Sequence, residues 1–136
     1  MYKTILVPID IANLDKGKSM VDIAATHAGK DTQIILLNVV EEIPNWAAAG
    51  IPQDILDKSR QTSEEEMDAI AKASGISVDV EVRTGHSYNT ILEVAEEKAV
   101  DLIIIASHSP GLQTYFLGST AAKVVRHAKC SVLVTR

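Results

Sequence analysis

Five short runs rich in Ile, Val and Leu recur along this chain, and they constrain its fold more than any other feature. The first, second and fourth runs are nearly continuous rather than alternating, which is typical of strands buried on both faces of a parallel sheet. Helices must then cover those faces. The expected strands are residues 5–9, 34–40, 78–82, 102–106 and 132–134.

Segments with helical spacing of apolar residues lie between these runs. Ser87 and Ser119 are placed to cap the third and fourth helices, because a serine oxygen can accept from the amides of a first turn. Gly29 and Gly75 stand where the first and second helices should stop. The expected helices are residues 16–28, 53–74, 88–99 and 119–129.

The order of these elements predicts a single α/β domain over residues 1–136, with a parallel sheet and right-handed crossovers. A chain of 136 residues fits one such domain, whereas two domains would lack core. Residues 41–52 are expected to form a long irregular connection. The sequence leaves two interpretations of residues 43–52 open: an ordinary connection with Trp46 on the surface, or a functional lid.

Composition limits the classes of partner and the compartment. The formal net charge is -5 and no basic run is present, which argues against binding to nucleic acid or to an anionic membrane. The single cysteine, Cys130, cannot form an intrachain disulfide, and no stretch of about 18 apolar residues occurs. We therefore expect a cytoplasmic protein.

Candidate ligand-binding segments follow the strands, because open α/β sheets bind ligands at the carboxyl ends of their strands. This rule selects residues 8–10, 39–41 and 106–120. The last segment is rich in Ser, Thr, Gly and His, and Gly118-Ser119-Thr120 opens a helix whose free amides suit phosphate. An ordinary turn with a helix cap is the alternative interpretation.

Other residues near the strand ends give weaker signals. Asp10 can accept from a ribose hydroxyl or hold a metal, but it equally suits a cap or turn. The main chain of Val39 can meet the edge of an adenine ring. Ser107 and His108 lack a nucleophile elbow and a nearby acid, so we do not predict catalysis by this pair. Neither a P-loop nor a dinucleotide fingerprint is present.

Several segments, in order along the chain, carry a resemblance to a known family: Tyr2-Lys-Thr-Ile-Leu-Val-Pro-Ile-Asp10, Leu36-Leu-Asn-Val39, Gly85, Asp101-Leu-Ile-Ile-Ile-Ala-Ser-His108, Leu117-Gly-Ser119 and Val124-Val-Arg-His-Ala-Lys-Cys-Ser-Val-Leu-Val134. On these residues the whole chain resembles the universal stress proteins. This resemblance implies an adenine-nucleotide alpha-hydrolase-like fold, in which helices cover both faces of a five-stranded parallel sheet of order 3-2-1-4-5. The closing segment is similar to the F-type branch of bacterial members.

The glycine pattern of the family is altered in this chain. Members that hold ATP carry G-x2-G-x9-G-[S/T] after the fourth strand. Here Ala106 and Ser109 stand where the first two glycines would be, and eight residues separate Ser109 from Gly118.

The resemblance also implies a ligand and an assembly. ATP is the implied ligand, with Mg²⁺ held at Asp10. Family members pair the last strand, here Ser131–Thr135, antiparallel with its copy, which implies a homodimer or homotetramer. Adenosine would face Pro8, Ile9, Asp10 and Val39, whereas ribose and phosphates would face Ala106, Ser109, Gly118, Ser119 and Thr120, with His108 inside the same motif.

Three functional hypotheses remain. The first is a stress-response module in which an adenine nucleotide alters oligomer contacts and partner choice without turnover. The second is a slow ATPase or phosphotransferase that uses Asp10, Mg²⁺ and Ser119 or Thr120, although no convincing general base is present. The third is an interaction protein whose altered loop no longer binds nucleotide.

Overall fold

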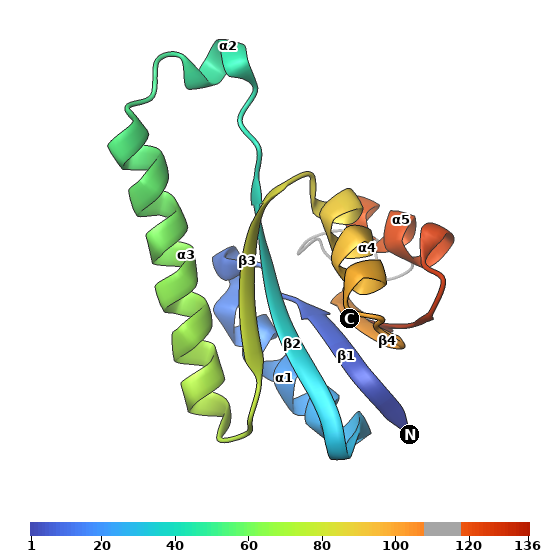
Figure 1. Ribbon diagram of the computed structural model, residues 1–136. Coiled ribbons are helices and arrows are strands. Elements are labelled where there is room, and N and C mark those ends of the chain that lie inside the picture. The colour runs from blue at the N-terminus through green and yellow to red at the C-terminus, as the bar shows by residue number, and fades with distance from the viewer. Residues whose placement is uncertain (108–117) are drawn as a thin grey trace.

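A five-stranded parallel sheet forms the centre of the computed structural model, which describes residues 1–107 and 118–136 (Figure 1). The strand order is β3-β2-β1-β4-β5, which confirms the expected fold class and order. The fourth expected strand matches β4 residue for residue, whereas β2 begins six residues earlier than expected. The strands are β1 (Tyr2–Pro8), β2 (Ala28–Glu41), β3 (Asp79–Gly85), β4 (Leu102–Ala106) and β5 (Ser131–Thr135).

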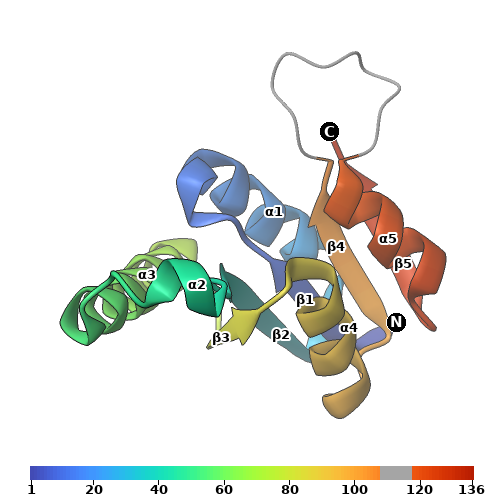
Figure 2. The same cartoon turned by 90° about the horizontal axis from the view of Figure 1, so that it is seen from above.

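Helices cover both faces of the sheet. One face carries α1 (Leu14–His27) and α3 (Gln53–Ser74), and the opposite face carries α4 (Ser87–Glu97) and α5 (Ser119–His127) (Figures 1 and 2). The 22 residues of α3 are those that the apolar spacing predicts. None of the helices in the described residues is both long enough and apolar enough to span a bilayer.

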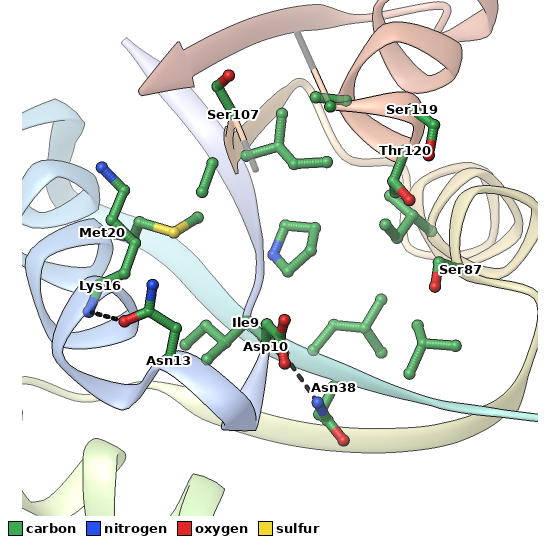
Figure 3. A pocket seen from close by; sticks show the side chains of 18 of the residues that line it. Ile9, Asp10, Asn13, Lys16, Met20, Asn38, Ser87, Ser107, Ser119 and Thr120 are labelled. Atoms are coloured by element: carbon green, nitrogen blue, oxygen red, sulfur yellow. Dashed lines mark hydrogen bonds between the residues drawn. The ribbon is translucent and has the colours of Figure 1, made fainter. Parts of the chain in front are cut away.

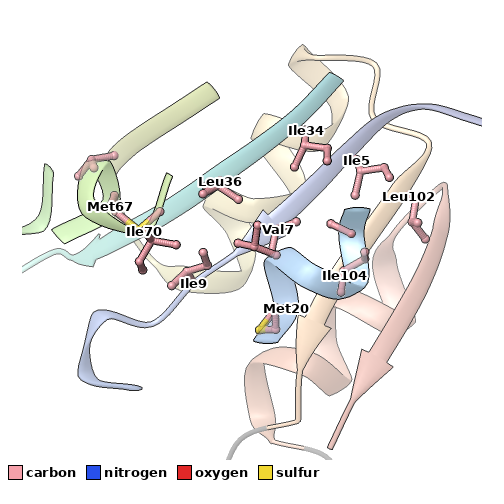
Figure 4. Packing of buried hydrophobic residues seen from close by; sticks show 13 residues of the cluster. Ile5, Val7, Ile9, Met20, Ile34, Leu36, Met67, Ile70, Leu102 and Ile104 are labelled. Carbon is pink, nitrogen blue, oxygen red and sulfur yellow. The ribbon is translucent and has the colours of Figure 1, made fainter. Parts of the chain in front are cut away.

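Two apolar cores lie on the two sides of the sheet. Ile5 and Val7 of β1 pack toward α1 and α3, while Leu6 between them packs toward α4 and α5. All three side chains are fully buried. This alternation explains why β1 reads as a continuous apolar run, because each face of the strand meets its own layer of helices. Figure 4 shows the first core, in which Met20 and Met67 reach the sheet from α1 and α3.

The helix ends correct three expectations. Gly118 and His86 occupy the cap positions of α5 and α4, so that Ser119 and Ser87 are first helical residues rather than caps. Gly29 lies inside β2 and does not stop α1, because Ala28 is already extended at φ -92° and ψ 139°. Gly75 does end α3, with the left-handed φ of 71° that glycine accommodates without strain.

The connection from β2 to α3 contains a short helix that the sequence did not predict. This helix, α2 (Asn45–Ala48), lies beyond the sheet, near the N-terminal end of α3 (Figure 1). Trp46 is 85% exposed, as the interpretation of an ordinary surface connection requires. The alternative role as a lid stays a prediction.

Candidate functional site

A crevice of about 600 Å³ opens at the carboxyl ends of β1, β2 and β4 (Figure 3). From β1, the chain adds β2 and β3 on one side of the sheet and then β4 and β5 on the other. The strand order therefore reverses between β1 and β4, where the crevice lies. Eight of the ten predicted site residues lie in the described part of the chain, and all eight line this crevice. They are Pro8, Ile9, Asp10, Val39, Ala106, Gly118, Ser119 and Thr120. The other two, His108 and Ser109, lie outside the described residues.

Asp10 follows β1 and caps a short 3-10 helix, η1 (Ile11–Asn13). Its Oδ1 accepts from the main-chain amide of Ala12 at 2.9 Å. The capping interpretation of Asp10 is therefore confirmed, and the same residue also lines the crevice. The cap turns the chain away from the sheet directly after β1, which opens the space beside the end of β2.

Asn38 of β2 holds the floor of the crevice. Asn38 is only 5% exposed, and its Nδ2 donates to the main-chain oxygen of Ile9 at 2.8 Å. The Ile9 amide donates to the main-chain oxygen of Leu37, also at 2.8 Å. Both polar main-chain groups of Ile9 are thus bonded to β2, and Ile9 can offer a ligand mainly its apolar side chain.

One wall of the crevice comes from α1, and the sequence analysis did not select it. Lys16 and Met20, four residues apart, share one face of the helix, and both line the crevice together with the N-cap residue Asn13. Gly17 lets this helix approach β1, because a Cβ at Gly17 would lie 2.8 Å from the Cγ2 of Ile9. The signal that could have found this wall is the polar face of α1 immediately after the Asp10 turn.

The opposite wall joins the end of β2 to the start of α4. The Ser87 amide donates to Oε1 of Glu41 at 3.3 Å, and the Ser87 hydroxyl donates to the same oxygen. A carboxylate at a helix N-terminus is stabilised by the free amides and the helix dipole. Glu41 falls within the predicted segment 39–41, but Ser87 was expected only to cap its own helix.

The third wall is the start of α5. Gly118 is buried and adopts φ -63° and ψ 156°, and its oxygen accepts from the Ala122 amide at 2.9 Å. Ser119 is exposed and Thr120 is half-buried, and both residues line the crevice (Figure 3). Within residues 1–107 and 118–136, no side chain caps α5, so none of these side chains occupies the first amides of the helix.

The charged groups of the crevice are few. Among the described lining residues they are Asp10, Lys16 and Glu41, so Lys16 is the one cation in this set. Within residues 1–107 and 118–136 no group of three or more His, Cys, Asp or Glu side chains is placed to hold a metal ion. The described crevice therefore offers mixed polar and apolar walls with a single positive group.

The fold and the crevice together define an open α/β domain with a ligand-sized opening at the switch point of a parallel sheet. The chain belongs to the universal stress protein family, because the model of that family matches residues 1–136. It is also 32% identical to universal stress protein G of Escherichia coli O157:H7 over 145 residues that cover 100% of both chains. The narrower resemblance to the F-type branch stays a prediction.

Two solved structures show the same architecture. The hypothetical protein MJ0577, whose biochemical function was assigned from its structure, is 27% identical with a TM-score of 0.81, covering 99% of this chain and 96% of its own. A universal stress protein crystallised in complex with cAMP is 23% identical with a TM-score of 0.64, covering 99% and 97%. The second likeness shows the shared fold alone.

Proposed function

We propose that the crevice binds an adenine nucleotide, ATP in particular, and that occupancy changes the contacts of this protein with its own copies or with partner proteins. One observation carries the proposal. The eight described residues predicted to face the nucleotide come from four separate segments of the chain, and the fold brings all of them into one crevice. Its volume of about 600 Å³ lies within the range of small-molecule sites, roughly 300–1,000 Å³.

The base is assigned to the end of β2. Because the Leu37 oxygen accepts from Ile9, the main-chain groups of Leu37 face β1. Main-chain groups of residues two apart point to the same side of a strand, so those of Val39 also face this side. The last residue of β1, Pro8, pairs with Leu37, so β1 does not extend beside Val39. The Val39 amide and carbonyl therefore face the crevice. They match the donor and acceptor edge of adenine.

Apolar side chains complete the place for the base. Pro8, Ile9, Leu37 and Ile105 line the crevice from the sheet, and Ile91 adds to them from α4. A flat aromatic ring buries apolar surface against such side chains while its polar edge meets a few fixed groups. A universal stress protein has been crystallised with cAMP, which is also an adenine nucleotide.

The ribose and phosphates are assigned to the end of β4 and the start of α5. Ala106 leaves β4, and Gly118, Ser119 and Thr120 begin the helix across the crevice. The helix N-terminus supplies free amides and the positive end of the dipole, and the two hydroxyls add donors. Asp10 is the carboxylate that we assign to Mg²⁺, with the phosphates supplying further oxygen ligands.

The last strand is assigned to self-association, because the two edges of the sheet differ. At the β3 edge, Arg60 of α3 donates to the Val82 oxygen at 2.9 Å and to the Thr84 hydroxyl at 3.1 Å. A cationic side chain over an edge strand prevents pairing with another strand. The edge strand β5 carries Val132 and Val134 and has no charged residue within Ser131–Thr135. We therefore propose that β5 pairs antiparallel with its copy.

Calorimetric titration with ATP, AMP and GTP, with and without Mg²⁺, tests the nucleotide proposal. The variants are Gly118→Val, which places a branched side chain at the start of α5, and Gly50→Val as its control. A Cβ at Gly50 meets nothing within 4 Å. We expect ATP binding in the wild type and in Gly50→Val, and its loss in Gly118→Val.

Two outcomes would contradict this proposal. If ligand-free wild-type protein binds no nucleotide, the better hypothesis is an interaction protein that has lost nucleotide binding. If Gly118→Val binds ATP as tightly as the wild type, the phosphates do not lie at the start of α5. Turnover of ATP in the same samples, abolished in Asp10→Ala, would instead favour the ATPase hypothesis.

A further inference from the structure

The side chain of Lys16 is a charged feature of the crevice that the family resemblance does not assign. Among the described lining residues Lys16 is the only cation, and the two carboxylates of the set belong to Asp10 and Glu41. Phosphate groups are anionic, so these carboxylates oppose the binding of a phosphorylated ligand unless a cation is close to the phosphates. Lys16 is the described lining residue that can supply this charge.

The start of α1 directs Lys16 toward the crevice. The Asn13 Oδ1 accepts from the Lys16 amide at 3.4 Å and caps the helix, which fixes the first turn beside the end of β1. Gly17 allows the close approach of this turn to Ile9. Figure 3 shows the Lys16 side chain rising along the crevice wall, on the same side as Met20.

The ammonium group lies beside the ends of β4 and β5. Lys16 Nζ donates to the main-chain oxygen of Arg136 at 2.6 Å, and Arg136 directly follows β5. One residue earlier, the Thr135 oxygen accepts from the Ser107 amide at 2.7 Å, where the chain leaves β4. The cation is thus held near the strand end to which the proposed function assigns the phosphates.

We propose that Lys16 is the residue by which this protein prefers phosphorylated adenine nucleosides over adenosine. This inference rests on the proposed function, because it assumes that adenosine occupies the β2 side of the crevice. Lys16 is half-buried and its flexible four-carbon stem carries three donors. When a phosphate is present, the ammonium donates to a phosphate oxygen, either in place of the Arg136 oxygen or in addition to it. A hydrogen bond to a charged phosphate oxygen is stronger than one to a neutral carbonyl.

Titration of adenosine, AMP and ATP into Mg²⁺-free protein tests this role, because Mg²⁺ would itself neutralise phosphate charge. The variants are Lys16→Gln, Lys16→Arg and the matched control Lys18→Gln, whose residue is exposed on the same helix and outside the crevice lining. We expect Lys16→Gln to weaken ATP by roughly ten- to a hundredfold. Adenosine affinity should stay within about twofold, because the base and ribose contacts are unchanged.

The conservative and control variants sharpen the result. Lys16→Arg should retain most of the preference for ATP over adenosine, and Lys18→Gln should retain all of it. An equal loss of adenosine and ATP in Lys16→Gln, or no loss of either, would overturn the role of Lys16. Wild-type protein that binds neither ligand would overturn the proposed function itself, whereas wild type that binds both equally would overturn only this inference. A thermal unfolding curve of each variant verifies that it is folded.

Discussion

Asn38 shows how one buried side chain determines the shape of the crevice floor. Asn38 is 5% exposed, and its side-chain amide donates to the Ile9 oxygen at 2.8 Å, between the end of β1 and the Asp10 turn. A buried polar side chain is tolerated when it is hydrogen-bonded. The partner of Asn38 is the carbonyl of Ile9, which lies one residue beyond the end of β1. Asn38 is therefore a positioning residue for the segment that carries Pro8, Ile9 and Asp10.

Replacing Asn38 with alanine should both destabilise the protein and loosen the crevice. The change removes the donor to Ile9 and leaves a buried carbonyl unsatisfied, which costs about 1–3 kcal/mol. Urea unfolding should show this loss, while Asn89→Ala, at an exposed position of α4, should change the free energy of unfolding by less than about 0.5 kcal/mol. Unchanged stability of Asn38→Ala would mean that water or a shifted main chain satisfies Ile9.

At the scale of elements, the starts of β1 and β4 are joined by one carboxylate. Asp101 accepts from the Lys3 amide through Oδ2 and from the Thr4 amide through Oδ1, both at 2.9 Å, and its own amide donates to the Thr4 oxygen at 3.0 Å. These contacts bring together residues 97 and 98 positions apart. They fix the register of the two strands whose opposite ends form the crevice.

This link predicts a specific loss of stability in acid. Desolvation of the Asp101 carboxyl favours its neutral form, but the hydrogen bonds from Lys3 and Thr4 outweigh it, so the pKa of Asp101 is lowered in the folded state. The unfolded chain then binds the proton more readily, and the stabilisation present at neutral pH is lost as pH falls below about 4. Urea unfolding between about pH 6 and 2.5 should show this decline.

Substitution of Asp101 by asparagine separates this contribution from general acid unfolding. Asp101→Asn should be less stable than the wild type at neutral pH and should lose less further stability in acid, because the titrating group is gone. Asp68→Asn, at an exposed position of α3, should keep the wild-type slope. If the slopes of wild type and Asp101→Asn were identical, the carboxylate would contribute no acid-sensitive stability.

At the scale of the whole molecule, the two edges of the sheet have opposite characters. Arg60 covers the outer edge of β3, whereas β5 is short and apolar at the other edge. Because the Thr135 oxygen faces β4, the main-chain groups of Val132, three residues earlier, face outward from the sheet. Pairing between two copies at β5 would satisfy those groups and would join two crevices through a continuous ten-stranded sheet.

Proline at position 132 tests this assembly. Val132→Pro removes an outward amide near the start of β5, where proline is best tolerated, and leaves the bonds to β4 in place. We expect sedimentation velocity to show a dimer or larger assembly for the wild type and for Val132→Thr, and a folded monomer for Val132→Pro. A monomeric wild type, or an unchanged assembly in Val132→Pro, would contradict pairing at β5.

The sequence alone predicts most strands and helices of the fold, because the patterns that indicate them are local. A strand covered on both faces needs consecutive apolar residues, so the run at residues 102–106 predicts β4 with its correct bounds. The amphipathic spacing of residues 53–74 and the glycine that follows likewise predict α3 and its end. The caps at Ser87 and Ser119 were wrong by one residue, because the sequence does not show where the main chain enters helical geometry.

What the sequence determined by itself is therefore the order of the main elements, the strand ends at which we expect a ligand, and eight of the nineteen described residues that line the crevice there. The tertiary structure decided which other side chains complete the crevice. Asn38 reaches Ile9 across 29 residues, Glu41 reaches Ser87 across 46, and Lys16 reaches Arg136 across 120. No local pattern specifies such pairs, because they form only when the packing of helices on the sheet brings distant segments together.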